Sequence, residues 1–408
     1  MTTPPRPGRP TADPSGIPAA LAGQFSDDDV ERLIALRRDL HAHPELSWKE
    51  HRTADALTAE LQRLKPAALD RVAGTGLVAR IAGRDRAAPV VAVRGDIDAL
   101  PIQEATGLPF TSRHDGVMHA CGHDVHATWA VGAARLLARE PAAGDVLIVL
   151  QPAEELGEGA TRVLESGALD NVRMIFGGHV DRRFEVGEVV AEEGALAASS
   201  DTFAMTITGR GAHGARPHEA DDPIVGAAAL VGALQTIVAR RLDPGVAGVI
   251  TVGTISAGSA PNVIPDEARL GGTIRATTAA TRERLHDELR RIAAGIASAH
   301  SLEIAVDITT GTPPIVNPAG PARIAADAAR ALLGADAVVP FGVTNMGGED
   351  FAFYLERMPG CFLRIGARER GGPWYAAHSP RFVAAEESLF VGAAVLAACA
   401  RAASASLA

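Results

Sequence analysis

The stretch DVLIVLQPAEELGEG (145–159) joins an almost uninterrupted apolar segment to two adjacent carboxylates. The apolar part, 145–152, predicts a strand buried on both faces, which is typical of a parallel sheet. Glu154 and Glu155 follow directly, where such a strand would end. In open α/β sheets ligands collect beyond the carboxyl ends of the strands, so we expect a functional site around this acid pair.

Strands and helices alternate on both sides of this stretch. We predict helices at 30–41, 129–140, 159–166, 319–333 and 384–400, and further strands at 78–83, 89–95, 173–180 and 361–366. This alternation favours an α/β domain whose mainly parallel sheet is covered by helices on both faces.

Between these blocks the pattern changes to alternating apolar and polar residues, beginning at 201–210. Helices at 222–240 and 280–299 and strands at 247–257, 266–275 and 302–310 follow. The order βαββαβ predicts an inserted ferredoxin-like domain. We therefore expect a disordered leader (1–24), a catalytic domain (25–198 and 312–405) and an inserted lid or dimerisation domain (199–311).

Composition excludes several classes of protein. The 408 residues are 47% hydrophobic and 22% charged, which predicts a sizeable core, and the net charge of −10 argues against nucleic acid or an anionic membrane as partner. No run approaches the roughly 20 apolar residues of a membrane span, and no secretory signal is evident. Three scattered cysteines do not suggest disulfides and suit a cytoplasmic protein.

Candidate metal ligands accompany the acid pair. MHACGHDVH (118–126) holds Cys121 and His123, and single histidines return at His179 and His378. Thiolate, imidazole and carboxylate together make a borderline-soft site, in which one glutamate could bind metal while the other moves a proton. Each residue alone is more often structural, as a core cysteine, a hydrogen-bonded histidine or a solvated helix start. Spacing alone leaves both interpretations open.

Other polar residues have similar alternatives. Asp96 and Asp98 follow a buried strand, where one of them could hydrogen-bond a metal-bound imidazole or simply cap the next element. His213 lies in a glycine-rich loop that could be an ordinary turn. Asn262 and Arg275 lie near the start and end of a predicted strand, and an arginine there could hold a carboxylate or only be solvated.

Taken together, the motifs are familiar over about residues 28–400. The chain resembles the metal-dependent amidohydrolases of the hippurate hydrolase and indole-acetyl-amino-acid hydrolase type, in the superfamily of aminoacylase and carboxypeptidase G. The resemblance is carried by RRDLHAHPEL (37–46), RGDIDALPIQE (94–104), MHACGHDVH (118–126), QPAEELGEGA (151–160), GAHGARPHEADDPI (211–224), NVIPDEARLGGTIRA (262–276), MGGEDFAFYL (346–355) and HSPRF (378–382).

This resemblance implies a site for two divalent metal ions, zinc or manganese, with cobalt possible. It implies Cys121, His123, Glu155, His179 and His378 as ligands, Glu154 as general base and Asp98 as the acid behind a ligand. His213 resembles the residue that polarises the scissile carbonyl, which in related dimers comes from the partner subunit. Asn262 and Arg275 resemble residues that hold the substrate's carboxylate.

The expected reaction is hydrolysis of the amide bond of an N-acyl amino acid, in a homodimer or higher homo-oligomer. A dipeptidase or carboxypeptidase on the same site, a carbamoyl-amino-acid hydrolase and a noncatalytic ligand-binding relative are the alternatives. The chain departs from the usual pattern at DRRFEVGEV (181–189), where relatives have a proline-containing loop, and at Ala197 and Ala377. These departures bear on the substrate and leave the reaction unchanged.

Overall fold

The computed structural model describes residues 17–408, which form two compact units. Of the described residues, the first unit comprises 17–194, Asn317–Gly342 and Phe353–Ala408, and the second comprises Ala195–Val316 and Val343–Ala352. The second unit is wider than the expected insertion at 199–311, since it begins at Ala195, continues to Val316 and includes the short segment Val343–Ala352.

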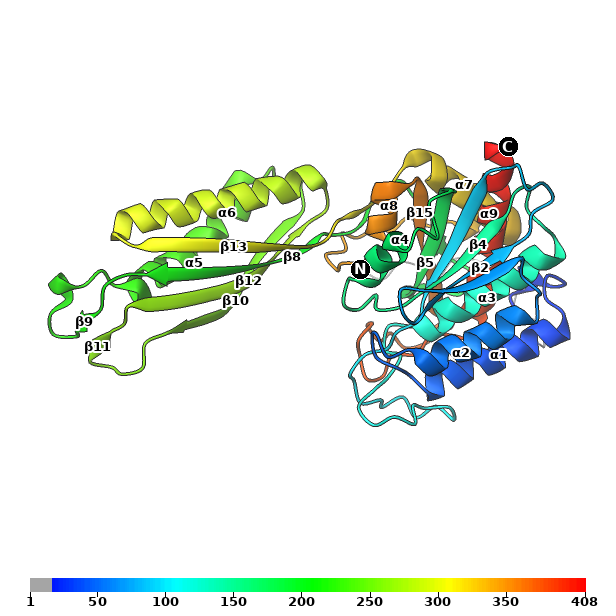
Figure 1. The fold of residues 1–408 in the computed structure, drawn as a ribbon, viewed down its shortest axis with the longest axis horizontal. Helices are drawn as coiled ribbons and strands as arrows, with labels where there is room; N and C mark the ends of the chain where they lie inside the picture. The colour runs from blue at the N-terminus through cyan, green and yellow to red at the C-terminus, as the bar shows by residue number, and fades with distance from the viewer. Residues whose placement is uncertain (1–16) are drawn as a thin grey trace. The chain divides into compact units, whose positions relative to one another are not determined.

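The first unit is built on a seven-stranded sheet in the order β1-β2-β4-β3-β5-β15-β6 (Figure 1). Its four central strands are parallel to one another, whereas the flanking strands run antiparallel to their neighbours. The predicted mainly parallel sheet is therefore confirmed. The strands are β1 (Ala68–Val72), β2 (Gly76–Ile81), β3 (Val90–Asp96), β4 (Val146–Gln151), β5 (Val172–Glu185), β6 (Val189–Val190) and β15 (Gly360–Arg368).

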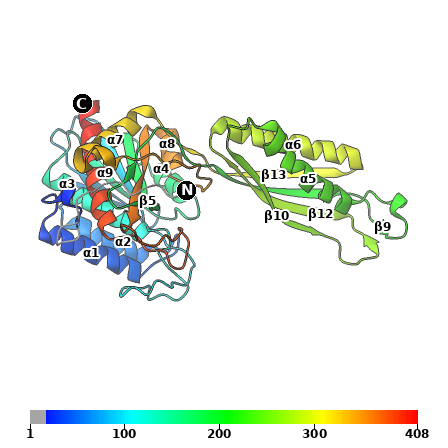
Figure 2. The ribbon, with the colours of Figure 1, turned by 180° about the vertical axis from the view of Figure 1, so that it is seen from behind.

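Helices cover this sheet, and two of them form the centre of the packing. Helix α3 (His123–Arg139) and helix α9 (Glu387–Leu407) pack against each other and against the central strands, and Figure 2 shows α7 (Ala319–Leu333) and α9 on the near side of the sheet. The remaining helices of this unit are α1 (Asp27–Ala42), α2 (His51–Gln62) and α4 (Gly159–Glu165), with α8 (Ala352–Arg357) at its boundary. Every residue of β4 is buried, as its continuous apolar sequence predicts.

The first helix begins as its sequence predicts. Ser26 accepts a hydrogen bond from the backbone N–H of Asp29, and the Asp29 side chain accepts one from the backbone of Ser26. This reciprocal cap satisfies N–H groups that a helix start leaves unpaired. The predicted leader needs a correction, because Ile17 and Leu21 are buried in the core. The rest of that predicted leader, 1–16, lies outside the described residues.

The second unit follows the predicted order βαββαβ. Strands β8 (Ser200–Thr208), β10 (Gly248–Ala257), β12 (Glu267–Ala276) and β13 (Glu303–Thr312) form an antiparallel sheet in the order β10-β12-β8-β13. Helices α5 (Pro223–Arg241) and α6 (Ala279–His300) pack on it. A small ladder of β9 (Ala212–His213) and β11 (Val263–Ile264) extends from one end, and β7 (Gly194–Ala197) pairs with β14 (Ile315–Asn317) where the chain enters and leaves the unit.

Two helices in the described part of the chain, α5 and α9, are long and apolar enough to cross a membrane by length and composition. The expectation that no apolar segment approaches the length of a membrane span is therefore wrong for these two helices. The apolar stretch of α9 is 78% buried, as in the core helix of a soluble protein, and α5 packs against the sheet of the second unit. Both helices are weak evidence for a membrane.

Candidate metal centre

The residues expected to bind metal converge at the carboxyl ends of the parallel strands. Glu154 and Glu155 follow β4, His179 lies in β5, and His378 lies in the loop after β15. Cys121 precedes α3, whose first residue is His123. His123 and His179 thus lie inside regular elements, because α3 begins earlier and β5 ends later than predicted.

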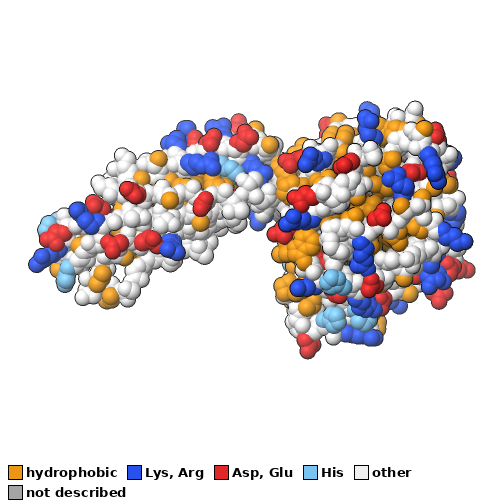
Figure 3. Space-filling view, in the orientation of Figure 1, with side chains coloured by type: hydrophobic (Ala, Val, Ile, Leu, Met, Phe, Trp, Pro, Cys, Tyr) orange, Lys and Arg blue, Asp and Glu red, His pale blue; other side chains and the backbone are white. Residues whose placement is uncertain are grey.

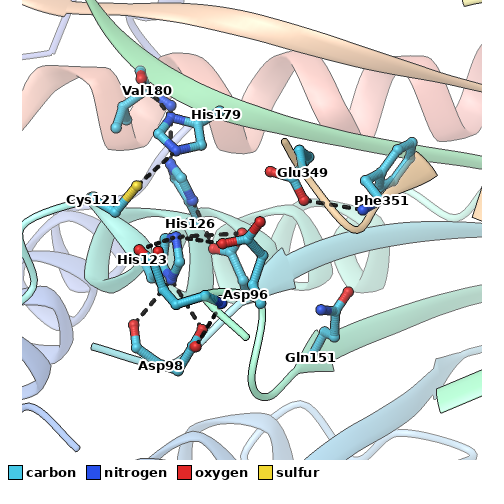
Figure 4. A network of polar contacts seen from close by, with 12 residues as sticks. Asp96, Asp98, Cys121, His123, His126, Gln151, His179, Val180, Glu349 and Phe351 are labelled. Carbon is cyan, nitrogen blue, oxygen red and sulfur yellow. Dashed lines mark hydrogen bonds and ion pairs between the residues drawn. The ribbon is translucent and has the colours of Figure 1, made fainter. Parts of the chain in front are cut away.

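Three overlapping groups that consist only of the expected ligands and Glu154 have all their donor atoms within 4.8 Å of one another. They are Cys121–His123–His179, Cys121–Glu155–His378 and His123–Glu154–Glu155. The Sγ atom of Cys121 lies 3.1 Å from Nε2 of His179, and Nε2 of His378 lies 3.4 Å from Oε1 of Glu155 (Figure 4 shows Cys121, His123 and His179). Cys121 is common to the first two groups.

Asp98 orients two of these residues at once. Its Oδ1 atom accepts a hydrogen bond from Nδ1 of His123 at 3.1 Å, and its Oδ2 atom accepts one from the backbone N–H of Glu155 at 3.0 Å. Ser47 donates to the same Oδ2 atom at 2.7 Å. With Nδ1 of His123 engaged, its Nε2 atom faces the carboxylates of the acid pair, 3.8 Å away from each.

His179 is oriented by a second network. Its Nδ1 atom donates to the backbone carbonyl of Val180 at 2.7 Å, which leaves Nε2 directed towards Cys121. The backbone N–H of Val180 donates to Nε2 of His126 at 2.9 Å, and Nδ1 of His126 donates to Asp96 at 2.7 Å (Figure 4). Asp96 therefore helps to orient His179 indirectly, because it holds His126, and His126 holds the backbone of Val180, whose carbonyl binds His179.

The backbone is held in unusual conformations next to the site. Ala153 and His378 have φ values of +51° and +65°, which residues with a Cβ seldom adopt. The buried carboxylate of Glu50 accepts a hydrogen bond from the backbone N–H of Ala153 at 2.9 Å and holds the turn that presents Glu154. Gly122, at φ +95°, lies so close to Val180 that a Cβ atom would come within 2.5 Å of its side chain.

The donor set fits divalent cations. Nε2 of His123 and Oε1 of Glu155 are buried in the described structure without a hydrogen-bond partner, an arrangement that is costly unless another ligand completes it. Both atoms face the cluster. Carboxylates, imidazoles and one thiol in this arrangement suit zinc or a similar ion.

The pKa values of three residues in the cluster are also consistent with a cation site. Burial and the charge of Glu155 raise the pKa of the Cys121 thiol well above its usual value, so without a cation the thiol keeps its proton. Burial, together with His126 and Arg364, lowers the pKa of His179 and keeps the ring neutral, as a metal ligand requires. Burial opposes ionisation of Asp98, but hydrogen bonding to His123 lowers its pKa and keeps it charged.

The three residues expected to contact substrate lie in the second unit, where His213 and Asn262 are neighbours and Arg275 lies apart from them. His213 is exposed in β9, beside Asn262, whose carbonyl accepts a hydrogen bond from the backbone N–H of Gly214 at 2.8 Å. Arg275 lies near the opposite end of β12, where it approaches the carbonyl of Met346 at 3.5 Å.

Sequence reasoning missed three supporting residues, Ser47, Glu50 and His126, as functional candidates. Ser47 and Glu50 lie directly after the HPEL motif at 43–46, and His126 lies three residues after His123 on the same helix. These positions were visible as parts of the motifs. Their partners are far apart in sequence, so their roles could not be seen.

Known proteins resemble this chain over most of its length. Residues 92–402 match the model of peptidase family M20/M25/M40. An N-acetyl-L-cysteine deacetylase of Bacillus subtilis is 40% identical over 365 residues, covering 88% of this chain and 85% of that protein. An IAA-amino acid hydrolase of Arabidopsis thaliana, ILR1-like 5, is 38% identical over 91% of this chain and 86% of its own length.

A solved structure is similar over almost its whole length. It is a dinuclear metal binding peptidase of Bacillus subtilis, 36% identical, with a TM-score of 0.83 over 94% of this chain and 99% of that chain.

Proposed function

This chain belongs to peptidase family M20/M25/M40, and from that premise we propose that it is a metal-dependent hydrolase that cleaves the amide bond of N-acyl amino acids. Two of the relatives are named for their substrates, N-acetyl-L-cysteine and IAA-amino acids. The observation that carries the proposal is the pair of donor groups sharing Cys121, with Glu154 beside them.

We assign one ion to Cys121, His123 and His179 and the other to Cys121, Glu155 and His378. Zinc suits a site that contains a thiolate, and manganese or cobalt could occupy it too. When bound, the ions supply Lewis-acid activation of a water molecule and of the carbonyl group.

Glu154 carries the proton in the proposed reaction. Its carboxylate removes a proton from the attacking water as the oxygen bonds to the carbonyl carbon. It then delivers that proton to the amide nitrogen as the C–N bond breaks, which releases a carboxylate and an amino acid. Glu154 suits this role because it lies beside Glu155 but is absent from the two groups that share Cys121.

Arg275 and Asn262 are proposed to hold the substrate's carboxylate, and His213 to stabilise the oxyanion. Within one subunit Arg275 is far from the other two groups, since the nine residues Glu267–Arg275 of β12 separate it from the β9–β11 end. Nine residues of strand span about 30 Å. One small substrate cannot contact His213 and Arg275 of the same subunit, which supports a site shared between subunits.

The surface of the second unit supports a homodimer. Edge strand β10 and the segment 223–239 of α5 carry no charged residue, and Ile224, Val225 and Ile255 are 43%, 52% and 59% exposed. Charged side chains lie mainly over α6 and towards the β9 end (Figure 3). An uncharged edge strand beside exposed apolar side chains is expected to be covered by a partner, here a second copy. We propose a cytoplasmic location for this dimer.

The test is turnover by the metal-reconstituted protein on a panel of substrates. N-acetyl, N-benzoyl and indole-acetyl amino acids represent the proposed class, a dipeptide with a free amino group represents a peptidase, and an N-carbamoyl amino acid represents a ureide hydrolase. We expect the acyl amino acids to be cleaved and a chelator to abolish cleavage. Protein shown to hold two ions that cleaves no acyl amino acid would contradict the proposal.

A further inference from the structure

Arg182 is a buried arginine with no role in the reaction described above. It lies in β5, three residues after His179, within the stretch DRRFEVGEV (181–189). Its side chain is only 2% exposed. A guanidinium removed from water in this way must be compensated by several partners, and those partners lie on one loop.

The loop in question, 369–383, contains no helix or strand, and it contains His378. The guanidinium of Arg182 donates to the carbonyl of Ala367 at 3.1 Å, where the chain enters the loop, and to the carbonyl of Val383, where the chain leaves it. It also donates to Oε2 of Glu369 at 2.9 Å and to the carbonyl of Pro373 at 2.6 Å. One side chain thus ties both ends of the loop and its first half to β5.

Few contacts hold the ring of His378 directly. Its side chain is 52% exposed, so packing contributes little to its position. Its backbone has the unfavourable φ of +65°, and its N–H donates to the carbonyl of Ala120 at 2.8 Å. Residues with unfavourable φ persist only where their surroundings impose the conformation. The position of the ring therefore depends on the shape of the loop.

We propose that Arg182 is the positioning residue for His378, and that it sets the affinity for the ion bound by Cys121, Glu155 and His378. The inference rests on the two-ion site proposed above. Strand β5 then has two tasks, because it provides the ligand His179 directly and holds the loop of the ligand His378 through Arg182. The planar, multidentate guanidinium suits this task, since a lysine cannot reach both loop ends at once.

The experiment compares Arg182→Met and Arg182→Lys with a matched control, Arg183→Met. Arg183 is the adjacent arginine, but its hydrogen bonds go to Asp181 on the same strand and none reaches the loop. Each protein is titrated with Co²⁺, and the absorption spectrum and the number of ions bound are recorded. Each is also exposed to trypsin, which can cut the loop after the exposed Arg370 and Arg381.

We expect Arg182→Met to bind the first ion, at Cys121, His123 and His179, as the parent does, which also shows that the variant is folded. Binding of the second ion should weaken about 10- to 100-fold, the range seen when a residue supporting a ligand is removed. Tryptic cleavage in the loop should accelerate, while Arg183→Met should match the parent. If Arg182→Met fails to fold, Arg182→Lys should show the same selective loss.

Parent-like affinity for both ions and parent-like cleavage in a folded Arg182 variant would overturn the inference. Equal weakening of both ions would also overturn it, because it would indicate a general structural role. A parent protein that binds fewer than two ions would instead contradict the proposed function, so the two failures are distinguishable.

Discussion

The carboxylate of Asp98 accepts a hydrogen bond from Nδ1 of His123 at 3.1 Å, and this contact fixes which nitrogen of the imidazole faces the acid pair. The other oxygen of the same carboxylate accepts the backbone N–H of Glu155 at 3.0 Å. One buried acid therefore aligns two proposed ligands that lie 32 positions apart, His123 on α3 and Glu155 after β4. Its loss should affect metal binding before it affects the fold.

Asp98→Asn should lower metal affinity about 10- to 100-fold, because an amide has one accepting oxygen where the carboxylate has two. Competition with a chromogenic chelator would measure the change. Asp70→Asn, at an exposed aspartate of β1, is the matched control and should bind metal like the parent. Unchanged affinity in Asp98→Asn would show that the contact with His123 is dispensable.

Cys121→Ala should remove the donor common to both ions and lose metal and activity while remaining folded. The reason is that no other residue belongs to both of the groups proposed to hold the ions. Elemental analysis and circular dichroism would measure the two properties. Cys399→Ala, at a cysteine buried in α9, is the control and should retain metal. Full metal occupancy in Cys121→Ala would contradict the assignment of Cys121 as a ligand.

Much of the fold was predictable because apolar patterns are local. The continuous apolar run of β4 and the capped start of α1 were visible in the sequence, and both are found. The start of α3 was not, because the helix begins at polar residues, His123 and Asp124, that are buried by long-range partners. Helix α2 was missed for a similar reason, since charged residues interrupt its apolar pattern.

For the candidate site, the donor residues were predictable but the residues that hold them in place were not. The donor residues could be named from the resemblance, since they lie within recognisable motifs. Their supports could not, because the contact of Glu50 with Ala153 or of Arg182 with the loop around His378 joins segments more than 100 residues apart. Such contacts depend on the folded chain and leave no local pattern in the sequence.

His41 should make stability depend on pH. Burial and the nearby charge of Arg37 disfavour the charged form of the imidazole. The charge of Asp124 and hydrogen bonds to Asp124 and Glu104, at 2.9 and 3.2 Å, favour that form. The favourable interactions prevail, so the pKa of His41 is raised above 6.5. The folded state then holds a proton that the unfolded chain releases. The stabilisation is complete below about pH 6.5 and is lost as pH rises through the raised pKa.

Between these two pKa values the unfolding free energy should fall by up to about 1.4 kcal/mol per pH unit. His41→Gln should remove this contribution, whereas His51→Gln, at an exposed histidine, should keep it. Urea denaturation at several pH values from 6 to 9 would measure the slope. A slope in His41→Gln equal to that of the parent would rule out the explanation.

Mixing His213→Ala with Glu154→Gln should restore activity if His213 acts in the partner subunit. Random exchange makes half of the dimers mixed, and one of their two sites has both residues intact, so roughly a quarter of the sites should recover. Subunit exchange would be followed independently by mass spectrometry of differently tagged chains. Mixing Glu154→Gln with Glu155→Gln is the control and should recover nothing, because both residues belong to the same site. No recovery in mixed His213→Ala dimers would mean that His213 acts within its own chain or not at all.

The separate roles of the acid pair are tested most directly by measuring metal content and turnover together in Glu154→Gln and Glu155→Gln. Glu154→Gln should keep two ions per subunit while turnover of an N-acyl amino acid falls roughly 10²- to 10⁴-fold, as the loss of a general base requires. Glu155→Gln should lose metal, because its carboxylate is a proposed ligand. Equal loss of metal from both variants, or parent-like turnover in Glu154→Gln, would contradict hydrolysis by Glu154 at a two-ion site.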